Sequence, residues 1–337
     1  MYRGAIVGLG NVALGGHLPA WKKSSEFRIV AGVDSVEGRL GLFGHALPAA
    51  ARMASVADLP EDLDFVDICT PPHTHFDLAF FALERGWNVL CEKPLVLSEE
   101  QFDRIRQLAM NKERVLFTVH NWRFAPICRK IVEIVCGGVL GEIRHCAWNV
   151  VRSGPSVTTG TDNWRLDPRR AGGGILVDHG WHAFYLVLEW VGRRPVGVQA
   201  SLENRQHAEW EVEDTALIKI QFESVNGHSR TADIFLTWAS NDRRNWGVVS
   251  GSLGRLDIED DTLRLDIGDG GCEVFHFDSR LSAGSHHPDW FEFVIEEFGS
   301  ELRDASCRGA NLSTVHQCLR LVERSRAASQ KKAFLAV

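Results

Sequence analysis

Two stretches of the sequence carry side chains that could move a proton. In the stretch VLCEKPLVLS, an apolar run ends at an adjacent acid and base, Glu92 and Lys93. Charges at the end of a buried strand are costly unless they are paired, so these two groups either close a surface turn or belong to a site. Farther along the chain, Asp178 and His182 are four residues apart, which on a helix places both side chains on one face.

These groups suit the removal of a proton from a hydroxyl group. An imidazole titrates near neutral pH and a carboxylate one turn away can orient its ring, so we interpret His182 as a general acid/base and Asp178 as its partner. A desolvated Lys93 beside a cationic ring could bind the hydroxyl or relay its proton. The spacing alone leaves a structural interpretation equally open, in which Asp178 and His182 form a helix-surface pair and Lys93 joins a turn salt bridge.

The N-terminal residues predict a dinucleotide site. An apolar run leads into GLGNVA, a G-x-G-x-x-A pattern that starts at Gly8. Gly8 permits a tight turn, Gly10 lets the backbone approach a pyrophosphate, and Ala13 lets the next helix pack close to the strand. The N-terminal amides of that helix would point at the phosphates.

A second apolar run supports this prediction. It ends in Asp34, 26 residues after Gly8. An acid at this point can accept hydrogen bonds from the adenosine ribose and would repel a 2′-phosphate, which favours NAD over NADP. The alternative, a glycine-rich turn with no ligand, is disfavoured by the position of the pattern between two strands and by the acid that follows.

Strand-like and helix-like stretches then alternate, which predicts an α/β Rossmann domain with a doubly wound parallel sheet over residues 1–124. Ligands of such sheets bind beyond the carboxyl ends of the strands. Thr70, the turn at Glu92 and Lys93, and Asn121 all fall at predicted strand ends. Lys93 is therefore expected near the cofactor.

The remainder of the chain, residues 125–337, predicts a second domain of the α+β class. Seven strand-like stretches follow one another with turn residues between them, which indicates a largely antiparallel open sheet. One helix is expected from about Gly174 through Val191. Two amphipathic helices at the end either cover this sheet or return to the first domain.

Composition excludes several classes of protein. The charge is −7, from 37 basic and 44 acidic residues, and no block of Lys or Arg marks a nucleic-acid surface. There is no apolar run of membrane-spanning or signal-peptide length. The eight cysteines form no C-x-x-C pair and no zinc-binding spacing, so we predict no metal site, reduced thiols and a cytoplasmic protein.

Four stretches together resemble the glucose–fructose oxidoreductase / inositol dehydrogenase (Gfo/Idh/MocA) family. They are GLGNVALGGHLPAW, DICTPPHTHFDLAFFALERGWNVLCEKPL, HNWRF and GGGILVDHGWH. The resemblance covers essentially the whole chain and is closest up to about residue 190. It implies hydride transfer between NAD(H) or NADP(H) and a hydroxyl or carbonyl carbon of a sugar, inositol or related polyol.

The same resemblance assigns site residues. It implies cofactor contacts at Gly8, Gly10, Asn11, Val12, Asp34, Thr70, Pro71, His75, Glu92, Lys93, Asn121, Trp164 and Arg165. It implies substrate contacts at Lys93, Arg123, Trp164, Arg165, Asp178, His182 and Tyr185. With the cofactor loop present, Lys93, Asp178 and His182 are expected to be catalytic.

One position departs from the family pattern. The family often has an aspartate three residues after the helix histidine, where this chain has Tyr185. A phenol can hydrogen-bond but carries no charge at neutral pH. Specificity for a simple sugar or inositol is therefore open, and Arg123, Arg152 and Arg165 would suit an acidic or phosphorylated substrate.

Two other functions stay open at this stage. A few relatives keep NAD bound and cleave a glycosidic bond by transient oxidation, and the fold also serves non-catalytic nucleotide-binding regulators. The intact Lys93, Asp178 and His182 argue against a regulator. Open sheet faces in the family commonly pair, so a homodimer or homotetramer is expected.

Overall fold

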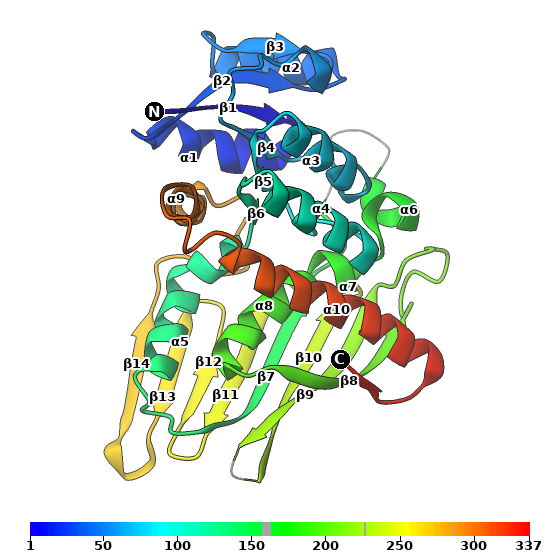
Figure 1. The fold of residues 1–337 in the computed structure, drawn as a ribbon. Coiled ribbons are helices and arrows are strands. Elements are labelled where there is room, and N and C mark those ends of the chain that lie inside the picture. The colour runs from blue at the N-terminus through cyan, green and yellow to red at the C-terminus, as the bar shows by residue number, and fades with distance from the viewer. Residues whose placement is uncertain (157–162, 226, 285) are drawn as a thin grey trace. The chain divides into compact units, whose positions relative to one another are not determined.

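The structure is a computed structural model that describes residues 1–156, 163–225, 227–284 and 286–337 (Figure 1). Contacts divide these residues into two units. The first unit holds residues 1–121 and 286–316, and the second holds 122–156, 163–284 and 317–337, without residue 226.

The first unit contains a six-stranded parallel sheet in the order β3-β2-β1-β4-β5-β6. Its strands are β1 (Tyr2–Val7), β2 (Phe27–Val33), β3 (Ala51–Met53), β4 (Phe65–Ile68), β5 (Asn88–Cys91) and β6 (Leu116–Thr118). The central strands are buried, as is typical of parallel strands covered on both faces. The predicted doubly wound α/β sheet is confirmed.

Helices connect these strands. They are η1 (Ala13–His17), α1 (Leu18–Lys23), α2 (Glu37–Ala46), η2 (Val56–Asp58), η3 (Pro72–Thr74), α3 (His75–Glu84) and α4 (Glu99–Asn111). The chain adds β2 and β3 on one side of β1 and then returns to add β4 to β6 on the other. Because such crossovers are right-handed, α1 and α2 cover one face and α3 and α4 the other.

The first unit also includes a late segment of the chain, α9 (Pro288–Arg303), for which the sequence left two positions open, on the second sheet or with the first domain. Aromatic rings hold α9 against α1 and the sheet. The Phe291 ring lies 5.9 Å from that of Trp21, and the Phe298 ring lies 5.7 Å from that of Phe65. The amphipathic pattern of α9 identifies an apolar face but does not say which sheet that face covers.

The second unit contains a nine-stranded sheet in the order β14-β13-β12-β11-β7-β10-β9-β8-β15. Its strands are β7 (Ile143–Val151), β8 (Pro195–Glu203), β9 (Thr215–Val225), β10 (His228–Thr237), β11 (Arg244–Gly251), β12 (Arg255–Ile258), β13 (Thr262–Asp266), β14 (Cys272–His276) and β15 (Leu335–Ala336). Pairing is antiparallel except between β7 and β10. The predicted largely antiparallel sheet is confirmed.

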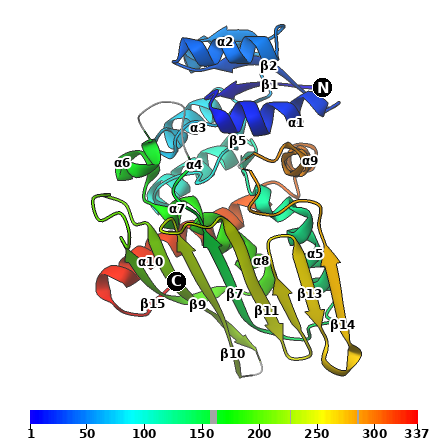
Figure 2. The same ribbon diagram turned by 180° about the vertical axis from the view of Figure 1, so that it is seen from behind.

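One face of this sheet carries the core of the second unit. Helices α5 (Pro126–Cys136), α8 (Gly180–Val191) and α10 (Ala310–Lys331) lie in front of it in Figure 1 and behind it in Figure 2. The ring of Trp148 on β7 meets that of Trp190 on α8 edge-on at 5.2 Å. Figure 2 looks onto the opposite face, across which none of the described helices runs.

The single helix expected from Gly174 is two helices in the structure, α7 (Ile175–Asp178) and α8, separated at His179. The side chain of Glu213 fixes the start of α7, because its Oε1 accepts hydrogen bonds from the backbone of Gly174 and Leu176, each at 3.0 Å. The remaining short helices are η4 (Asn121–Phe124), η5 (Trp164–Leu166), α6 (Pro168–Ala171) and η6 (Gly268–Gly270). Among the described residues, no helix combines the length and the apolar character needed to span a membrane.

The edge strand β6 is completed by a side chain from α10. Asn311 accepts a hydrogen bond from the Thr118 backbone amide at 2.8 Å and donates one to the Thr118 carbonyl at 3.0 Å. The backbone amide of Asn311 donates to the Glu301 carboxylate, which also accepts a hydrogen bond from the Gly309 amide. The start of α10 thus replaces a neighbouring strand.

We predict that Asn311→Ala lowers the free energy of unfolding by about 3 kcal/mol, because it leaves a buried N–H and a buried C=O without partners. Urea denaturation measures the effect, and Asn111→Ala on the exposed side of α4 is the control. A loss equal to that of the control would show that water replaces both bonds.

Candidate active site

The phosphate loop follows β1 and requires glycine at its first position. Gly8 has a φ of 88°, and a Cβ there would lie 2.7 Å from the Thr70 side chain and 2.9 Å from its amide. A Cβ on Gly10 would meet nothing within 4 Å, so this part of the backbone can approach a ligand closely. The exposed Asn11 and the half-buried Val12 complete the predicted loop.

Asp34 ties this loop to the end of β2. Its Oδ2 accepts a hydrogen bond from the Leu9 amide at 2.8 Å, and its Oδ1 accepts one from Val36 at 2.9 Å. The guanidinium of Arg39 lies 3.5 Å from Oδ2. A carboxylate has about four lone-pair positions, so Asp34 keeps acceptor capacity for a ribose.

The loop after β4 is held to the turn after β5 by a buried histidine. The His75 ring lies with Nδ1 2.7 Å from the Pro94 carbonyl and Nε2 2.7 Å from the Thr70 carbonyl. The Thr74 hydroxyl donates toward two oxygens, the Thr70 hydroxyl at 2.7 Å and the Pro71 carbonyl at 2.8 Å. Burial lowers the pKa of His75, and the two carbonyls partly oppose that shift.

A second buried histidine holds the other side of the same turn. His17 places Nδ1 2.9 Å from Oδ2 of Asp67 and Nε2 3.0 Å from Oε1 of Glu92. The indole of Trp21 donates to Asp67 at 2.7 Å, and the Lys93 amide donates to Oε2 of Glu92 at 3.0 Å. Glu92, Lys93 and Pro94 form an E-K-P motif, and its acid, Glu92, is therefore paired with a residue of η1.

The contacts of His17 make it an imidazolium. Both ring nitrogens face carboxylates, which accept hydrogen bonds but do not donate them. Burial by itself would lower the pKa of His17, but the charges and hydrogen bonds of Asp67 and Cys69 together outweigh burial, and the pKa is raised. Burial would raise the pKa of Glu92, but the contacts with His17 and Lys93 together outweigh burial and lower the pKa.

The same cluster includes Cys69, whose Sγ lies 3.2 Å from Nδ1 of His17. The ligand atoms of His17, Asp67 and Cys69 lie close enough together to hold a metal ion. Burial raises the pKa of the Cys69 thiol and the pKa of His17 is raised, so a metal ion at this cluster would have to displace a proton from each group.

Sequence reasoning missed His17 and Asp67. The available signal was a charged residue inside an otherwise apolar strand, because Asp67 is fully buried in β4 and a buried charge requires a partner. The sequence does not identify that partner, since His17 lies 50 residues earlier.

In the second unit, the hydroxyl of Tyr185 bonds to His182. Its oxygen lies 2.7 Å from Nδ1 of His182 and accepts a hydrogen bond from the Trp122 amide at 3.0 Å. The Trp122 ring stacks on that of His182 with centroids 4.5 Å apart. Burial raises the pKa of Tyr185, so its phenol stays neutral.

The charged residues near α7 form a second group in this unit. Asp178 places Oδ2 3.7 Å from Nε of Arg165 and 3.6 Å from Nδ1 of His179. The Arg165 guanidinium lies over the ring of Trp164 at 4.3 Å. Asp178 thus lies between the cationic Arg165 and the backbone break at His179.

Two of the arginines that suggested an acidic substrate have partners within the protein. Arg123 bonds to Glu189 through two nitrogens, with a shortest distance of 2.8 Å. Arg152 is buried and donates to the carbonyls of Val151 and Arg244, and burial lowers its pKa to about 10.

The predicted site residues therefore fall into two groups. The first unit holds Gly8, Gly10, Asn11, Val12, Asp34, Thr70, Pro71, His75, Glu92, Lys93 and Asn121. The second holds Arg123, Trp164, Arg165, Asp178, His182 and Tyr185. Their individual roles stay predictions.

A parallel sheet with a glycine-rich loop after β1, followed along the chain by an open, largely antiparallel sheet, is the fold of two-domain proteins that bind a dinucleotide. Residues 2–120 match the model described as "Oxidoreductase family, NAD-binding Rossmann fold", and residues 128–257 match the Gfo/Idh/MocA C-terminal domain. The chain belongs to the Gfo/Idh/MocA family. The predicted family and NAD cofactor are confirmed.

Similar proteins include D-glucoside 3-dehydrogenase of Escherichia coli K12, which is 32% identical over 188 residues. That alignment spans 53% of this chain and 51% of the relative, or about half the length of each. The aldose–aldose oxidoreductase of Caulobacter crescentus, solved with glycerol, has a TM-score of 0.83 at 22% identity over 100% of this chain and 99% of that one. An Agrobacterium radiobacter oxidoreductase, solved with NAD⁺, L-tartaric acid and magnesium, has a TM-score of 0.84 at 20% identity over 99% and 98%.

The His17 cluster predicts a pH-dependent stability. Because the pKa of His17 is raised, its contribution is complete below about pH 6.5, its ordinary value, and is lost as pH rises through the folded value. The lowered pKa of Glu92 means that its contribution is present above about 4.5 and is lost as pH falls through its folded value.

We therefore expect His17→Gln to destabilise the protein most between about pH 4.5 and 6.5, by about 3 kcal/mol, and less at higher pH. Denaturant unfolding of both proteins from pH 5 to 9 measures this difference. His45→Gln, an exposed histidine on α2, is the control. A difference that does not change with pH would mean that His17 is neutral in the folded state.

Proposed function

We propose that this protein is an NAD-dependent dehydrogenase that oxidises a hydroxyl carbon, or reduces the corresponding carbonyl, of a sugar, an inositol or a related polyol derivative. The observation that carries this proposal is the turn at Lys93. A basic side chain at the carboxyl end of β5 lies between two residues, Glu92 and Pro94, that buried histidines hold in place. Such a turn suits chemistry at a nicotinamide bound beyond the strand ends.

The cofactor contacts follow from the first unit. The backbone of Gly8 and Gly10 would bind the pyrophosphate, and Asp34 would accept hydrogen bonds from the adenosine ribose. NAD, when bound, accepts or supplies the hydride. Lys93 would hold the reacting hydroxyl and keep its oxygen oriented as the proton leaves.

His182 would take that proton as general base in the oxidation direction and return it in the reduction direction. The bond to Tyr185 engages Nδ1 and fixes the ring, and we assign the contact with the substrate hydroxyl to Nε2. We assign Tyr185 this orienting role in place of the substrate contact expected from sequence, and Asp178 and Arg165 the electrostatic environment of the same region.

The substrate class favoured here is neutral. Arg123 has a carboxylate partner in Glu189, and Nη1 of Arg152 donates to two backbone carbonyls, so both guanidinium groups have hydrogen-bond partners within the protein. The glucoside and aldose named for the relatives point to the same class. Nicotinamide absorbance in a screen of neutral polyols and sugar acids tests this, and a preference for acids would contradict it.

We predict that Lys93→Ala and His182→Ala each lower kcat by about 100-fold and leave the NAD dissociation constant nearly unchanged, because both residues act on the proton. Steady-state kinetics and NAD titration measure the two quantities. Lys22→Ala and His45→Ala, both exposed, are matched controls. An equal loss of NAD binding would show that the two residues are structural.

The two alternative functions differ in how they treat the nucleotide. Denaturing fresh protein and measuring the released NAD and NADH per chain distinguishes them from the dehydrogenase. A near-stoichiometric amount that does not exchange during turnover favours the NAD-retaining glycosidase-like enzyme. NAD that binds and exchanges without any turnover favours a regulator.

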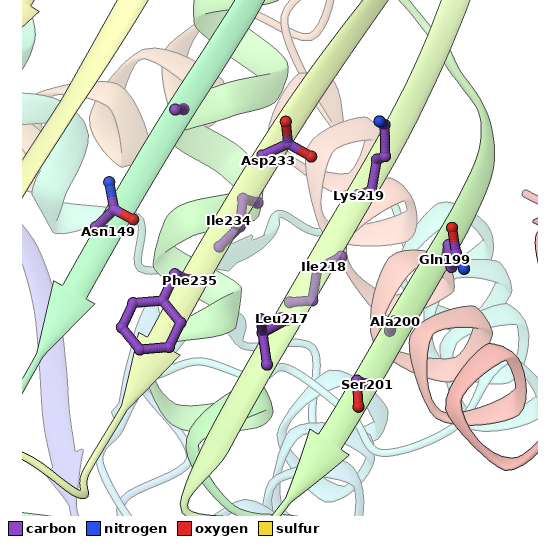
Figure 3. A pocket seen from close by; sticks show the side chains of 11 residues that line it. Asn149, Gln199, Ala200, Ser201, Leu217, Ile218, Lys219, Asp233, Ile234 and Phe235 are labelled. Carbon is purple, nitrogen blue, oxygen red and sulfur yellow. The ribbon is translucent and has the colours of Figure 1, made fainter. Parts of the chain in front are cut away.

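We further propose that the protein forms a homodimer or a homotetramer through the outer face of the nine-stranded sheet. A hollow of about 370 Å³ lies on this face. Figure 3 shows side chains that line it, among them the apolar Leu217 and Phe235 and the charged Lys219 and Asp233 on β9 and β10. Leu217 pairs with Phe235 and Lys219 with Asp233 across the two strands. A two-fold contact could match each charge with its opposite on a second copy.

We predict that the double variant Leu217→Asp/Phe235→Asp is a monomer, because it buries charges in that contact. Light scattering after gel filtration measures the mass. Leu42→Asp, an exposed leucine on α2, is the control. An unchanged mass would place the contact elsewhere.

The cytoplasmic location expected from the sequence is kept as part of the proposal. All eight cysteines lie within the described residues and are free thiols, which suits a reducing compartment. Cell fractionation tests it.

A further inference from the structure

The segment after the phosphate loop reaches the E-K-P turn through one side chain. His17 is the last residue of η1, which begins at Ala13 directly after the G-x-G-x-x pattern. Its ring contacts Asp67 on β4 and Glu92 after β5. The His17 ring thus connects the segment after the dinucleotide loop with β4 and with the turn that carries Lys93.

We propose that His17 is a positioning residue for the reaction: it links the phosphate-loop helix to Glu92 and thereby holds Lys93 in its working position. The inference rests on the proposed function, in which Lys93 holds the reacting hydroxyl. His17 itself touches neither the substrate nor the nicotinamide in this assignment.

The contacts of His17 leave its ring a single orientation. The side chain is 2% exposed and stacks on Phe291 with centroids 3.7 Å apart. Asp67 cannot turn away, because the Trp21 indole also donates to it at 2.7 Å. With Nδ1 fixed on Asp67, Nε2 points at Glu92 and fixes that carboxylate in turn.

The Glu92 carboxylate, held by His17, in turn fixes the backbone amide of Lys93. Its Oε1 accepts from His17, while its Oε2 accepts from the Lys93 amide at 3.0 Å. On the other side of Lys93, the Pro94 carbonyl contacts His75 of α3 at 2.7 Å. Loss of the His17 bond therefore frees one of the two anchors that flank Lys93.

A histidine suits this position because it supplies two N–H donors on opposite sides of a flat ring. A lysine has a single nitrogen at the end of a flexible chain, and a glutamine or asparagine has one amide nitrogen. The positive charge also balances one of the two carboxylates, the buried Asp67 and the half-buried Glu92, which would otherwise repel each other.

Two variants of His17 separate positioning from folding. The amide nitrogen of His17→Gln can occupy the place of Nε2 and keep the Glu92 bond, whereas that of His17→Asn occupies the place of Nδ1 and loses it. We expect His17→Asn to lower kcat by about 10- to 100-fold, because small displacements of a reacting group have effects of this size. His17→Gln should retain more of the activity, and NAD should bind both variants within about threefold of the parent protein.

The measurements are kcat, KM for the polyol and the NAD dissociation constant, with unfolding midpoints for each variant. Trp87→Phe is the control for lost stability, because this buried residue lies at the opposite end of β5 from the turn. Three results would overturn the proposal. They are equal losses of kcat in His17→Gln and His17→Asn, a parallel loss of NAD binding in these variants, or the same loss of kcat in Trp87→Phe.

If the parent protein turns over no polyol, the proposed function fails and the link is judged on its own. Single and double variants His17→Asn and Glu92→Gln then form a cycle of unfolding midpoints. The link between η1 and the turn is supported if the unfolding midpoint of the double variant falls by less than the sum of the falls in the two single variants. Additive losses would overturn it.

Discussion

The first unit depends on how it accommodates negative charge inside its sheet. Asp67 is fully buried in the middle of β4, where a carboxylate without partners would be very costly. The ring of His17 and the indole of Trp21 both donate to Asp67. The same His17 ring contacts Glu92, which accepts from the backbone amide of Lys93. Because one imidazole contacts both carboxylates, the helix after the phosphate loop, the central strand β4 and the turn at Glu92 are arranged as one group.

The close approach at the strand ends follows the same arrangement. A side chain on Gly8 would collide with the backbone of Thr70, so β1 and β4 can bring their loops together only with glycine at this position. His75 then fixes Thr70 to the carbonyl of Pro94. The residues that would touch a nicotinamide cofactor are held by the backbone and by buried histidines rather than by flexible surface side chains.

The second unit applies a similar principle to a different histidine. His182 is held by a neutral phenol from its own helix and by the stacked ring of Trp122. Tyr185 is 1% exposed, so its hydroxyl serves the protein interior. A phenol at this position orients the imidazole without adding charge, whereas an aspartate would add a negative charge beside it.

The sequence by itself determined the class of each domain, the dinucleotide loop and the family, because these depend on local patterns: glycines at fixed spacing, apolar runs of strand length and short contiguous motifs. It also located Lys93 just after a strand end. Only the tertiary structure paired His17 with Asp67 and Glu92, broke the expected helix at His179, returned α9 to the first sheet and bonded Tyr185 to His182. Partners of buried polar groups are selected by proximity in space, and residues 50 positions apart, such as His17 and Asp67, leave no local pattern by which the sequence could pair them.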